Sequence, residues 1–349
     1  MALSQAEIEA GVRLQANMCR ALGAPFTAAI IEAAADDYAS GGVLAELLHD
    51  WREEPMPAAL GLRLAGAFQY IARSEPESGL GALYRALDAN PDPETVRRLI
   101  ADTARSYAGV MSDYIARAVQ TNEVLRSAAL LGGFLEAAKQ TGLPLDLYEI
   151  GASAGLLLNW DQYAYDFGSF GWGRGAQRLS TEWKGPHPDW PQTVRVAGRR
   201  GCDISPVDYR DDKAVARAVS YIWVEQADRR ERYIKAVATA RDLKPEVEQA
   251  DAGDWLATRL EQRPDYCTAV VYHSVMMQYL SGETREKVRG AIEKAARSAS
   301  TSRPLAWLRF EPDEGGVNFA VDLTVWPGGS EQRLAYAHPH GAWVEWLGA

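Results

Sequence analysis

The chain of 349 residues carries 37 Lys and Arg against 47 Asp and Glu, a formal net charge of −10, and is 47% hydrophobic. This length suits about two domains with a real core, and the acidic balance argues against nucleic acid and anionic membranes as partners. The cysteines, Cys19, Cys202 and Cys267, are widely spaced, which predicts free thiols and no zinc site. Without a signal-peptide pattern or a long uncharged apolar run, we expect a soluble cytoplasmic protein that acts on a small molecule. Its oligomeric state stays open.

The first part of the chain has a helical pattern. Ser4 and Glu7 have the spacing of a capping box, and Pro93 is placed as the first residue of a helix whose apolar residues share one face. These residues are Val96, Leu99, Ile100, Tyr107, Val110, Met111 and Tyr114. No strand pattern precedes Leu145, so residues 1–142 are expected to form an all-helical N-terminal domain or cap.

After residue 142 the pattern changes to strands that alternate with helices. Strands are expected at 145–150, 199–204, 246–250, 268–273, 305–310, 319–326 and 333–346. Helices are expected at 154–165, 211–242 in two pieces, 253–262 and 283–299. This alternation predicts an α/β domain over 143–349, with a mostly parallel, Rossmann-like sheet, helices on both faces and an antiparallel edge.

Glycines, prolines and aromatic residues interrupt the alternation at about 166–198. The aromatic residues are Phe167, Phe170, Trp172, Trp183 and Trp190. Two interpretations are open: a flap over a pocket at the carboxyl edge of the sheet, or a surface hairpin held by its own tryptophans.

The most informative stretch is the apolar run 145–150 with the turn that follows it. The run predicts a buried parallel strand, and the turn contains Gly151, Ser153 and Gly155 with no bulky side chain among them. Together with Glu149, this turn resembles the first motif of class I S-adenosylmethionine-dependent methyltransferases. The resemblance implies a Rossmann-like methyltransferase fold, with S-adenosylmethionine as cofactor and these four residues in its binding site.

Three further segments follow in the order found in that family. Residues 201–206 resemble its second strand, which implies that Asp203 binds the ribose hydroxyls; a carboxylate suits this role because its two oxygens can accept from two O–H donors. Residues 250–256 resemble the loop after the third strand, which implies that Asp251 binds the adenine amino group. Residues 268–280 resemble the fourth strand and the segment behind it.

A narrower resemblance covers nearly the whole chain. The segments 121–126, 149–156, 202–208 and 338–346 are similar to an uncharacterised bacterial family catalogued as a domain of unknown function. This similarity implies the methyltransferase-like fold and brings no established reaction.

Two features depart from the methyltransferase pattern. Ser153 occupies the place of the middle glycine, so its side chain either donates a hydrogen bond to the cofactor or crowds it. Only residues 311–318 separate the fifth strand from Phe319. This segment is too short for the usual helix, so the edge of the sheet is expected to be altered.

Methyl transfer mainly requires a nucleophile held in line with the donor and, for some acceptors, a base. His273 and His338 are the candidate catalytic bases, with His340 beside the latter. Each has a structural alternative, as a hydrogen-bonded wall residue or as part of a turn.

Before the first strand, three polar residues mark a possible contact with substrate or cofactor. They are Asn122, Glu123 and Arg126. Ordinary helix capping and a solvated arginine explain them equally well. No metal ligand set is indicated.

Three alternative functions stay open. The turn 151–155 also matches G-x-S-x-G, the nucleophile elbow of α/β-hydrolases, with Ser153 as nucleophile and an Asp and a His later in the chain. That interpretation lacks the earlier strands of a hydrolase sheet. A dinucleotide enzyme shares the strand, turn and acidic residue but not the G-x-G-x-x-G order. A non-catalytic relative would bind a nucleoside and act through partners.

Overall fold

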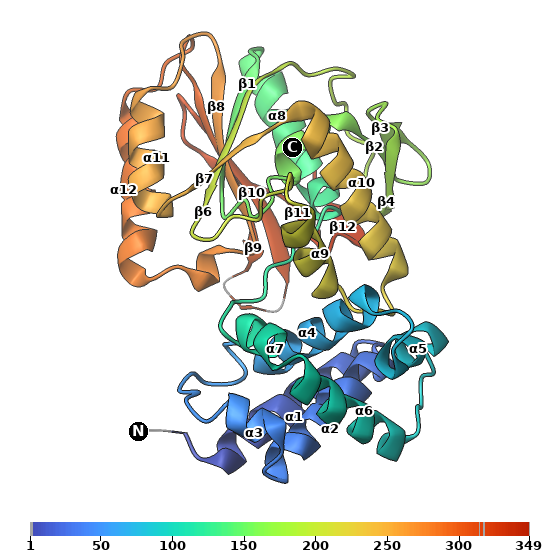
Figure 1. Cartoon of the computed structure of the whole chain (residues 1–349). Helices are drawn as coiled ribbons and strands as arrows, with labels where there is room; N and C mark the ends of the chain where they lie inside the picture. The colour runs from blue at the N-terminus through green and yellow to red at the C-terminus, as the bar shows by residue number, and fades with distance from the viewer. Residues whose placement is uncertain (1–2, 314, 317, 349) are drawn as a thin grey trace. The chain divides into compact units, whose positions relative to one another are not determined.

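The structure, a computed structural model, describes residues 3–313, 315–316 and 318–348 (Figure 1). The chain divides into two units, each continuous in space but not in sequence. The helical unit consists of Met1–Thr121 and Asp211–Glu231. The sheet unit consists of Asn122–Arg210 and Arg232–Ala349. None of the helices in the described part of the chain is both long and apolar enough to cross a membrane.

The helical unit surrounds one core to which its first seven helices and Tyr221 contribute. Ser4 and Glu7 form the expected capping box at its first helix, with both reciprocal hydrogen bonds in place. In chain order the helices are α1 (Gln5–Ala21), α2 (Pro25–Ala39), α3 (Val43–Leu47), α4 (Leu60–Ser74), α5 (Gly79–Ala86), α6 (Pro93–Ser106), α7 (Ala108–Ile115), α9 (Asp212–Ser220) and the start of α10 (Ala227–Leu243).

The helix that begins at Pro93 is shorter than its apolar pattern predicts. It ends at Ser106, because Tyr107 leaves helical geometry with φ −121° and ψ 33°, and α7 follows as a separate helix. The apolar stripe still packs in the core on both sides of the break: Ile100 and Met111 are each 0% exposed. Periodicity therefore identified the buried face but not the bend, since a one-residue break leaves the spacing almost unchanged.

The segment 211–231 joins the helical unit through contacts with residues far away in the sequence. Glu225 accepts hydrogen bonds from the backbone N–H of Thr27 at 2.8 Å and from its hydroxyl at 2.6 Å. These bonds supply the N-terminal cap of α2, whose own N-cap residue is an alanine. The Nε2 group of Gln69 donates to the carbonyl of Ile222 at 2.7 Å. The helical unit is thus built from two stretches of chain.

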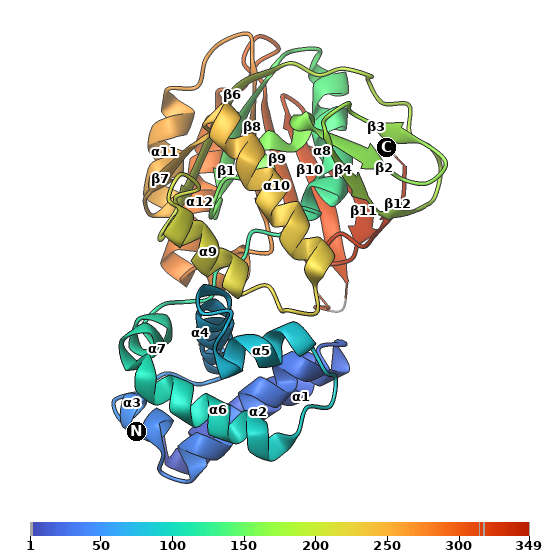
Figure 2. The same ribbon diagram turned by 45° about the vertical axis from the view of Figure 1, so that its right-hand side comes forward.

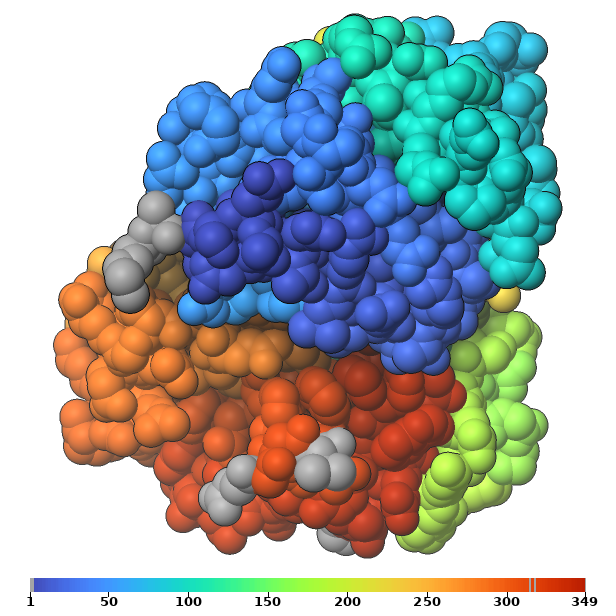
Figure 3. All heavy atoms as spheres, turned by 90° about the horizontal axis from the view of Figure 1, so that it is seen from below, coloured from blue at the N-terminus to red at the C-terminus, as the bar shows by residue number. Residues whose placement is uncertain are grey.

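Helix α1 presents apolar side chains to solvent along one line. Leu14, Met18 and Leu22 are 50%, 48% and 68% exposed and recur every four residues, a spacing that places the helical positions on one face. Figure 3 shows α1, in dark blue, at the surface of the helical unit. The opposite face of α1 carries the buried residues Ile8, Val12, Ala16 and Cys19.

The sheet unit is built on nine strands in the order β5-β12-β11-β10-β9-β8-β1-β6-β7. β1 lies parallel to β6 and β8, β6 to β7, and β8 to β9, whereas β9 to β12 pair antiparallel. The mostly parallel sheet with an antiparallel edge is therefore confirmed. The strands are β1 (Leu145–Ile150), β5 (Glu182–Lys184), β6 (Val196–Asp203), β7 (Glu246–Gln249), β8 (Thr268–Ser274), β9 (Leu305–Pro312), β10 (Phe319–Trp326), β11 (Glu331–Ala337) and β12 (Trp343–Trp346).

Helices cover both faces of this sheet. α11 (Ala252–Glu261) and α12 (Gly282–Arg297) lie on one face, and α8 (Arg126–Thr141) and α10 on the other (Figures 1 and 2). Helix α10 connects β6 to β7 and α11 connects β7 to β8, and these two connections cross the sheet in opposite directions. Because both are right-handed crossovers, their helices lie on opposite faces.

Helix α8 belongs with the sheet and not with the helices that precede it. A Cβ at Gly133 would lie 2.2 Å from the side chain of Leu308 on β9, so a glycine is needed for this close packing. The first division between the units therefore falls before α8, at 121/122, and two more fall at 210/211 and 231/232. The sequence predicts a single boundary at 142/143.

The expected helix at 154–165 is replaced by a short 3-10 helix, η1 (Leu157–Gln162), followed by the strand β2 (Tyr163–Asp166). The hydroxyls of Tyr163 and Tyr165 donate to the carbonyls of Leu156 and Trp160, both at 2.7 Å. Both carbonyls also accept from a backbone N–H group, that of Asn159 and that of Tyr163. The tyrosine hydroxyls therefore add a second hydrogen bond to each carbonyl and tie β2 to η1.

The aromatic insertion builds a small sheet and joins the antiparallel edge of the main one. β2, β3 (Gly171–Trp172) and β4 (Gln177–Ser180) form three strands, and β5 pairs with β12 at the end of the large sheet opposite β7. Its rings pack on one another and on Trp346, which lies 5.7 Å from Trp183 and 5.3 Å from Trp190 between ring centroids. These contacts match the hairpin interpretation, in which the tryptophans hold the insertion together.

Candidate functional site

The order of the parallel strands identifies where this sheet places a site. The chain runs outward from β1 through β6 to β7 and then returns to the other side of β1 to form β8 and β9. Between β1 and β8 the direction of winding changes, and open α/β sheets bind their ligands at the carboxyl ends of the strands at this switch point. The loops after β1, β6, β7, β8 and β9 all end at the same edge, so we build the site from them.

The turn after β1 has a left-handed backbone at three positions. Gly151, Ser153 and Gly155 have φ angles of 71°, 52° and 69°. A Cβ at Gly155 would lie 2.7 Å from the side chain of Val247, so both geometry and space require glycine there. Ser153 is the exception, since a side chain in this conformation costs free energy that its surroundings must offset.

Asp203, the last residue of β6, supplies that support. One carboxylate oxygen accepts from the backbone N–H of Ser153 and the other from the N–H of Ser205, both at 2.9 Å. The predicted ribose ligand therefore lies against the glycine turn, only 9% exposed. A carboxylate has about four acceptor positions, so this type of group can accept from hydroxyl donors as well as from backbone N–H groups.

Asp251 follows β7 at the same edge and caps α11. Its Oδ1 atom accepts from the N–H groups of Gly253 and Asp254 at 2.9 and 3.2 Å, and its Oδ2 atom from the hydroxyl of Thr284 at 3.0 Å. Partial burial raises the pKa of Asp251, but these hydrogen bonds outweigh burial and hold the pKa below its usual value. The contacts give Asp251 a capping role, and its contact with adenine stays a prediction.

Glu149 is a buried acid on β1, 2% exposed. Its Oε2 atom accepts from the hydroxyl of Tyr272 on β8 at 3.1 Å. Burial raises the pKa of Glu149 well above its usual value; the nearby charge of Asp203 acts in the same direction and the Tyr272 hydrogen bond opposes it. Glu149 therefore favours its protonated form more strongly than an exposed glutamate does.

The three polar residues at the start of α8 gather at the switch point. The Nδ2 group of Asn122 donates to the carbonyl of Ala152 in the glycine turn at 2.8 Å, while its buried Oδ1 atom has no hydrogen-bond partner among the residues that the structure describes. Arg126 donates to the carbonyl of Ser274, at the end of β8, at 3.3 Å. Glu123 accepts from the N–H of Leu125 at 3.1 Å. This side of the turn therefore presents an unused acceptor, the amide oxygen of Asn122.

The candidate base His273 is fully buried and bonded at both ring nitrogens. Its Nε2 atom accepts from the indole N–H of Trp307 at 3.2 Å, and its Nδ1 atom lies 2.6 Å from Glu311 Oε1. Because an indole only donates, Nε2 carries no proton and Nδ1–H donates to Glu311. His273 consequently has no free lone pair with which to act as a base, so the structural alternative describes it.

His338 and His340 lie in the turn between β11 and β12. The Nδ1 atom of His338 accepts from the backbone N–H of His340 at 3.1 Å. Burial lowers the pKa of His338, an effect that the nearby charge of Glu123 opposes. The imidazole is therefore mostly neutral at pH 7 and offers an Nε2–H donor. Within the described residues, no group of three His, Cys, Asp or Glu side chains is arranged to hold a metal ion.

Comparison with known proteins gives one match. A family model described as "Uncharacterized protein conserved in bacteria (DUF2332)" covers residues 9–346. The chain belongs to this family. No curated protein and no solved structure matches it.

Two further residues in this DUF2332 chain belong to the carboxyl edge and were not among the predicted site residues. Ile204, directly after Asp203, is 71% exposed although it is aliphatic. Glu311, at the end of β9, accepts from the N–H groups of Met276 and Met277 at 3.0 and 3.3 Å. The position of Ile204 after the acidic residue was available from the sequence, whereas the contacts of Glu311 depend on the pairing of β8 with β9.

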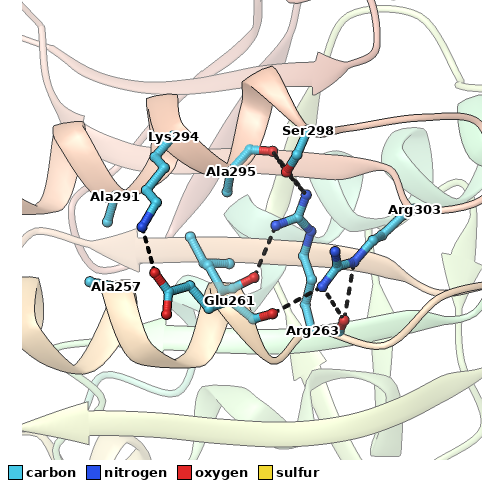
Figure 4. Close-up of a pocket in the computed structure, with 9 residues that line it drawn as sticks. Ala257, Glu261, Arg263, Ala291, Lys294, Ala295, Ser298 and Arg303 are labelled. Atoms are coloured by element: carbon cyan, nitrogen blue, oxygen red, sulfur yellow. Dashed lines mark hydrogen bonds and ion pairs between the residues drawn. The ribbon is translucent and has the colours of Figure 1, made fainter.

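A cavity of ≈ 200 Å³ lies elsewhere in the sheet unit, between α11 and α12 near the amino ends of β8 and β9 (Figure 4). Arg263 is buried there and donates to the carbonyls of Leu260 and Ala295, at 2.9 and 2.8 Å. Both carbonyls belong to the last turns of their helices, where a cation is stabilised by the helix dipoles. Arg263 in this cavity therefore has a structural role, since it joins the ends of α11 and α12. The cavity is distinct from the candidate site.

Proposed function

We propose that this protein binds S-adenosylmethionine at the carboxyl edge of its sheet and transfers the methyl group to a small-molecule acceptor. The observation that carries the proposal is the contact between Asp203 and the glycine turn at the switch point of a sheet whose parallel strands are ordered β7-β6-β1-β8-β9. This arrangement combines backbone in left-handed geometry, which a ligand can approach closely, with a carboxylate, a group that accepts hydrogen bonds from hydroxyls.

The residues at this edge fit the three parts of such a cofactor. The exposed side chain of Ile204 offers an apolar surface for a nucleobase, and Asp203 beside it offers acceptors for ribose hydroxyls. The unused Oδ1 atom of Asn122 and the buried carboxyl of Glu149 suit a cationic amino-acid end. When bound, the cofactor supplies an electrophilic methyl group on a sulfonium. The chain's part is to orient the reactants and exclude water, since His273 has no free lone pair.

A ligand screen tests this proposal. We expect S-adenosylmethionine and S-adenosylhomocysteine to raise the melting temperature and to give saturable calorimetric titrations, because a ligand that binds only the folded state stabilises it by mass action. NAD is expected to leave the melting temperature unchanged. Absence of binding by both sulfur nucleosides, or preferential binding of NAD, would contradict the proposal.

The hydrolase alternative has one specific observation in its favour, the left-handed conformation of Ser153, which is typical of a strained nucleophile elbow. An elbow serine needs a histidine lone pair to accept its proton. His273 uses its lone pair for Trp307, and His338 uses Nδ1 for the backbone of His340. The geometry therefore favours methyl transfer.

The variant Ser153→Ala separates these two functions. We expect it to keep S-adenosylhomocysteine affinity within about threefold of the parent, because the bond from residue 153 to Asp203 comes from its backbone N–H. Hydrolysis of p-nitrophenyl acetate, measured in both proteins, is expected to be equal and no faster than with Ser205→Ala as a control. Esterase activity that disappears only in Ser153→Ala would instead establish the elbow.

A further inference from the structure

The loop after β8 repeats the construction of the glycine turn on the other side of the switch point. Val275 has φ 53°, a left-handed conformation that is strongly unfavourable for a β-branched residue. The next two N–H groups, of Met276 and Met277, both donate to Glu311 Oε1. A carboxylate from the neighbouring strand thus holds each strained turn: Asp203 for Ser153 and Glu311 for Val275. Residues whose surroundings hold them in a strained backbone conformation are found most often at functional sites.

The two oxygens of Glu311 are used very differently. Oε1 takes three donors, the two backbone amides and Nδ1–H of His273 at 2.6 Å. Oε2 is buried and has no hydrogen-bond partner in the described structure. Because Trp307 donates to His273 Nε2, the other ring nitrogen, Nδ1, faces Glu311 as a hydrogen-bond donor and orients its carboxyl group.

Glu311 lies close to the glycine turn. Its partner Met276 packs against Gly151, where an added Cβ would lie 3.0–3.1 Å from the methionine side chain. One residue therefore connects the carboxylate to the turn that is proposed to hold the cofactor. A buried carboxylate oxygen that has no hydrogen-bond partner among the described residues favours a ligand that brings both a donor and a positive charge.

We propose that Glu311 Oε2 binds a protonated amine or a guanidinium of the acceptor substrate, which places the acceptor in the class of small cationic nitrogen compounds. That the bound cation is the methyl acceptor rests on the proposed function. The cation site itself is defined by Glu311 alone. It is consistent with the formal charge of −10, which raises the local concentration of cations.

The variant Glu311→Gln tests the site with little change of shape. Its amide oxygen can replace Oε1 for the three donors, whereas its NH2 group replaces the acceptor Oε2 with a donor. The probes are agmatine and phenethylamine, with the neutral 2-phenylethanol as comparison and NaCl at matched ionic strength. The control variant is Glu293→Gln, which makes the same charge change at an exposed position of α12.

We expect the two amines to raise the melting temperature of the parent and of Glu293→Gln, and Glu311→Gln to bind them at least tenfold more weakly. The alcohol is expected to bind none of these three proteins. Equal binding of the amines by parent and Glu311→Gln, or amines that bind the parent no better than the alcohol, would overturn the site. Should Glu311→Gln fail to fold, Glu311→Asp, which keeps the charge, is expected to retain amine binding within tenfold, and loss of its preference for amines over the alcohol would count against the proposal.

S-adenosylhomocysteine titrations of the same proteins separate this inference from the proposed function. Glu311→Gln is expected to bind S-adenosylhomocysteine like the parent, since Glu311 contacts the loop after β8 and not the turn itself. Failure of every protein to bind S-adenosylhomocysteine contradicts the proposed function, while the amine results still decide whether Glu311 forms a cation site.

Discussion

Replacing Asp203 by alanine is expected to weaken S-adenosylhomocysteine binding at least tenfold and to destabilise the sheet unit. The variant loses the acceptor for the N–H groups of Ser153 and Ser205, both 2.9 Å away, and the turn loses the support of its left-handed residue. One charge-assisted hydrogen bond contributes about 1.5–3 kcal/mol, and 1.4 kcal/mol corresponds to about tenfold in affinity. Calorimetric titration and urea unfolding measure the two effects.

Two further variants make the Asp203 result specific. Asp208→Ala removes the same charge from an exposed position in the loop that follows and is expected to bind like the parent. Asp203→Asn keeps one carbonyl oxygen and is expected to lie between parent and alanine variant. If Asp203→Ala folds and binds S-adenosylhomocysteine as tightly as the parent, the assignment of this site is wrong.

The free energy of unfolding of the parent is expected to fall as pH rises because of Glu149. Replacing Glu149 by glutamine is expected to abolish this fall. Burial raises the pKa of Glu149 well above its usual value, so the folded protein retains a proton that the unfolded chain has already released. The contribution of Glu149 to stability is complete below the unfolded pKa, near ~4.3. It then falls as pH rises toward the folded pKa, by up to about 1.4 kcal/mol per pH unit.

Urea unfolding between pH 5 and pH 8 measures this effect. Glutamine imitates the protonated acid, so the free energy of unfolding of Glu149→Gln relative to the parent is expected to increase steadily with pH. Glu293→Gln, at an exposed position, is expected to give a difference that does not change over this range. A constant difference for Glu149→Gln as well would mean that Glu149 is already ionised in the folded protein.

The sequence was most informative where a segment's burial is uniform. β1 is buried along its whole length and β10 over 320–324, and both have the predicted bounds, 145–150 and 319–326. Prediction failed where contacts between distant residues contribute to the local structure. β2 pairs with β4 where a helix was expected, and residues 211–231 join the helical unit through Glu225 and its partners.

The site shows the same contrast between local and distant information. The resemblance to methyltransferase motifs pointed to Gly151, Ser153, Gly155 and Asp203, and the structure brings these residues together at one edge. The roles of Glu311 and His273 depend on the parallel pairing of β8 with β9, across more than 30 residues of sequence. No local pattern reports which histidine nitrogen carries the proton, since that follows from the indole of Trp307.

Helix α2 receives its cap from Glu225 only late in the synthesis of the chain. Thr27 and Glu225 are separated by 198 positions, so at ~5–20 residues per second the first helices are exposed for roughly 10–40 s before this partner is synthesised. During that interval much of the sheet unit is also incomplete, because β7 to β12 follow later still. A nascent chain of this length offers chaperones an unfinished helical surface, and a release of the first 121 residues alone would leave α2 without its N-terminal carboxylate.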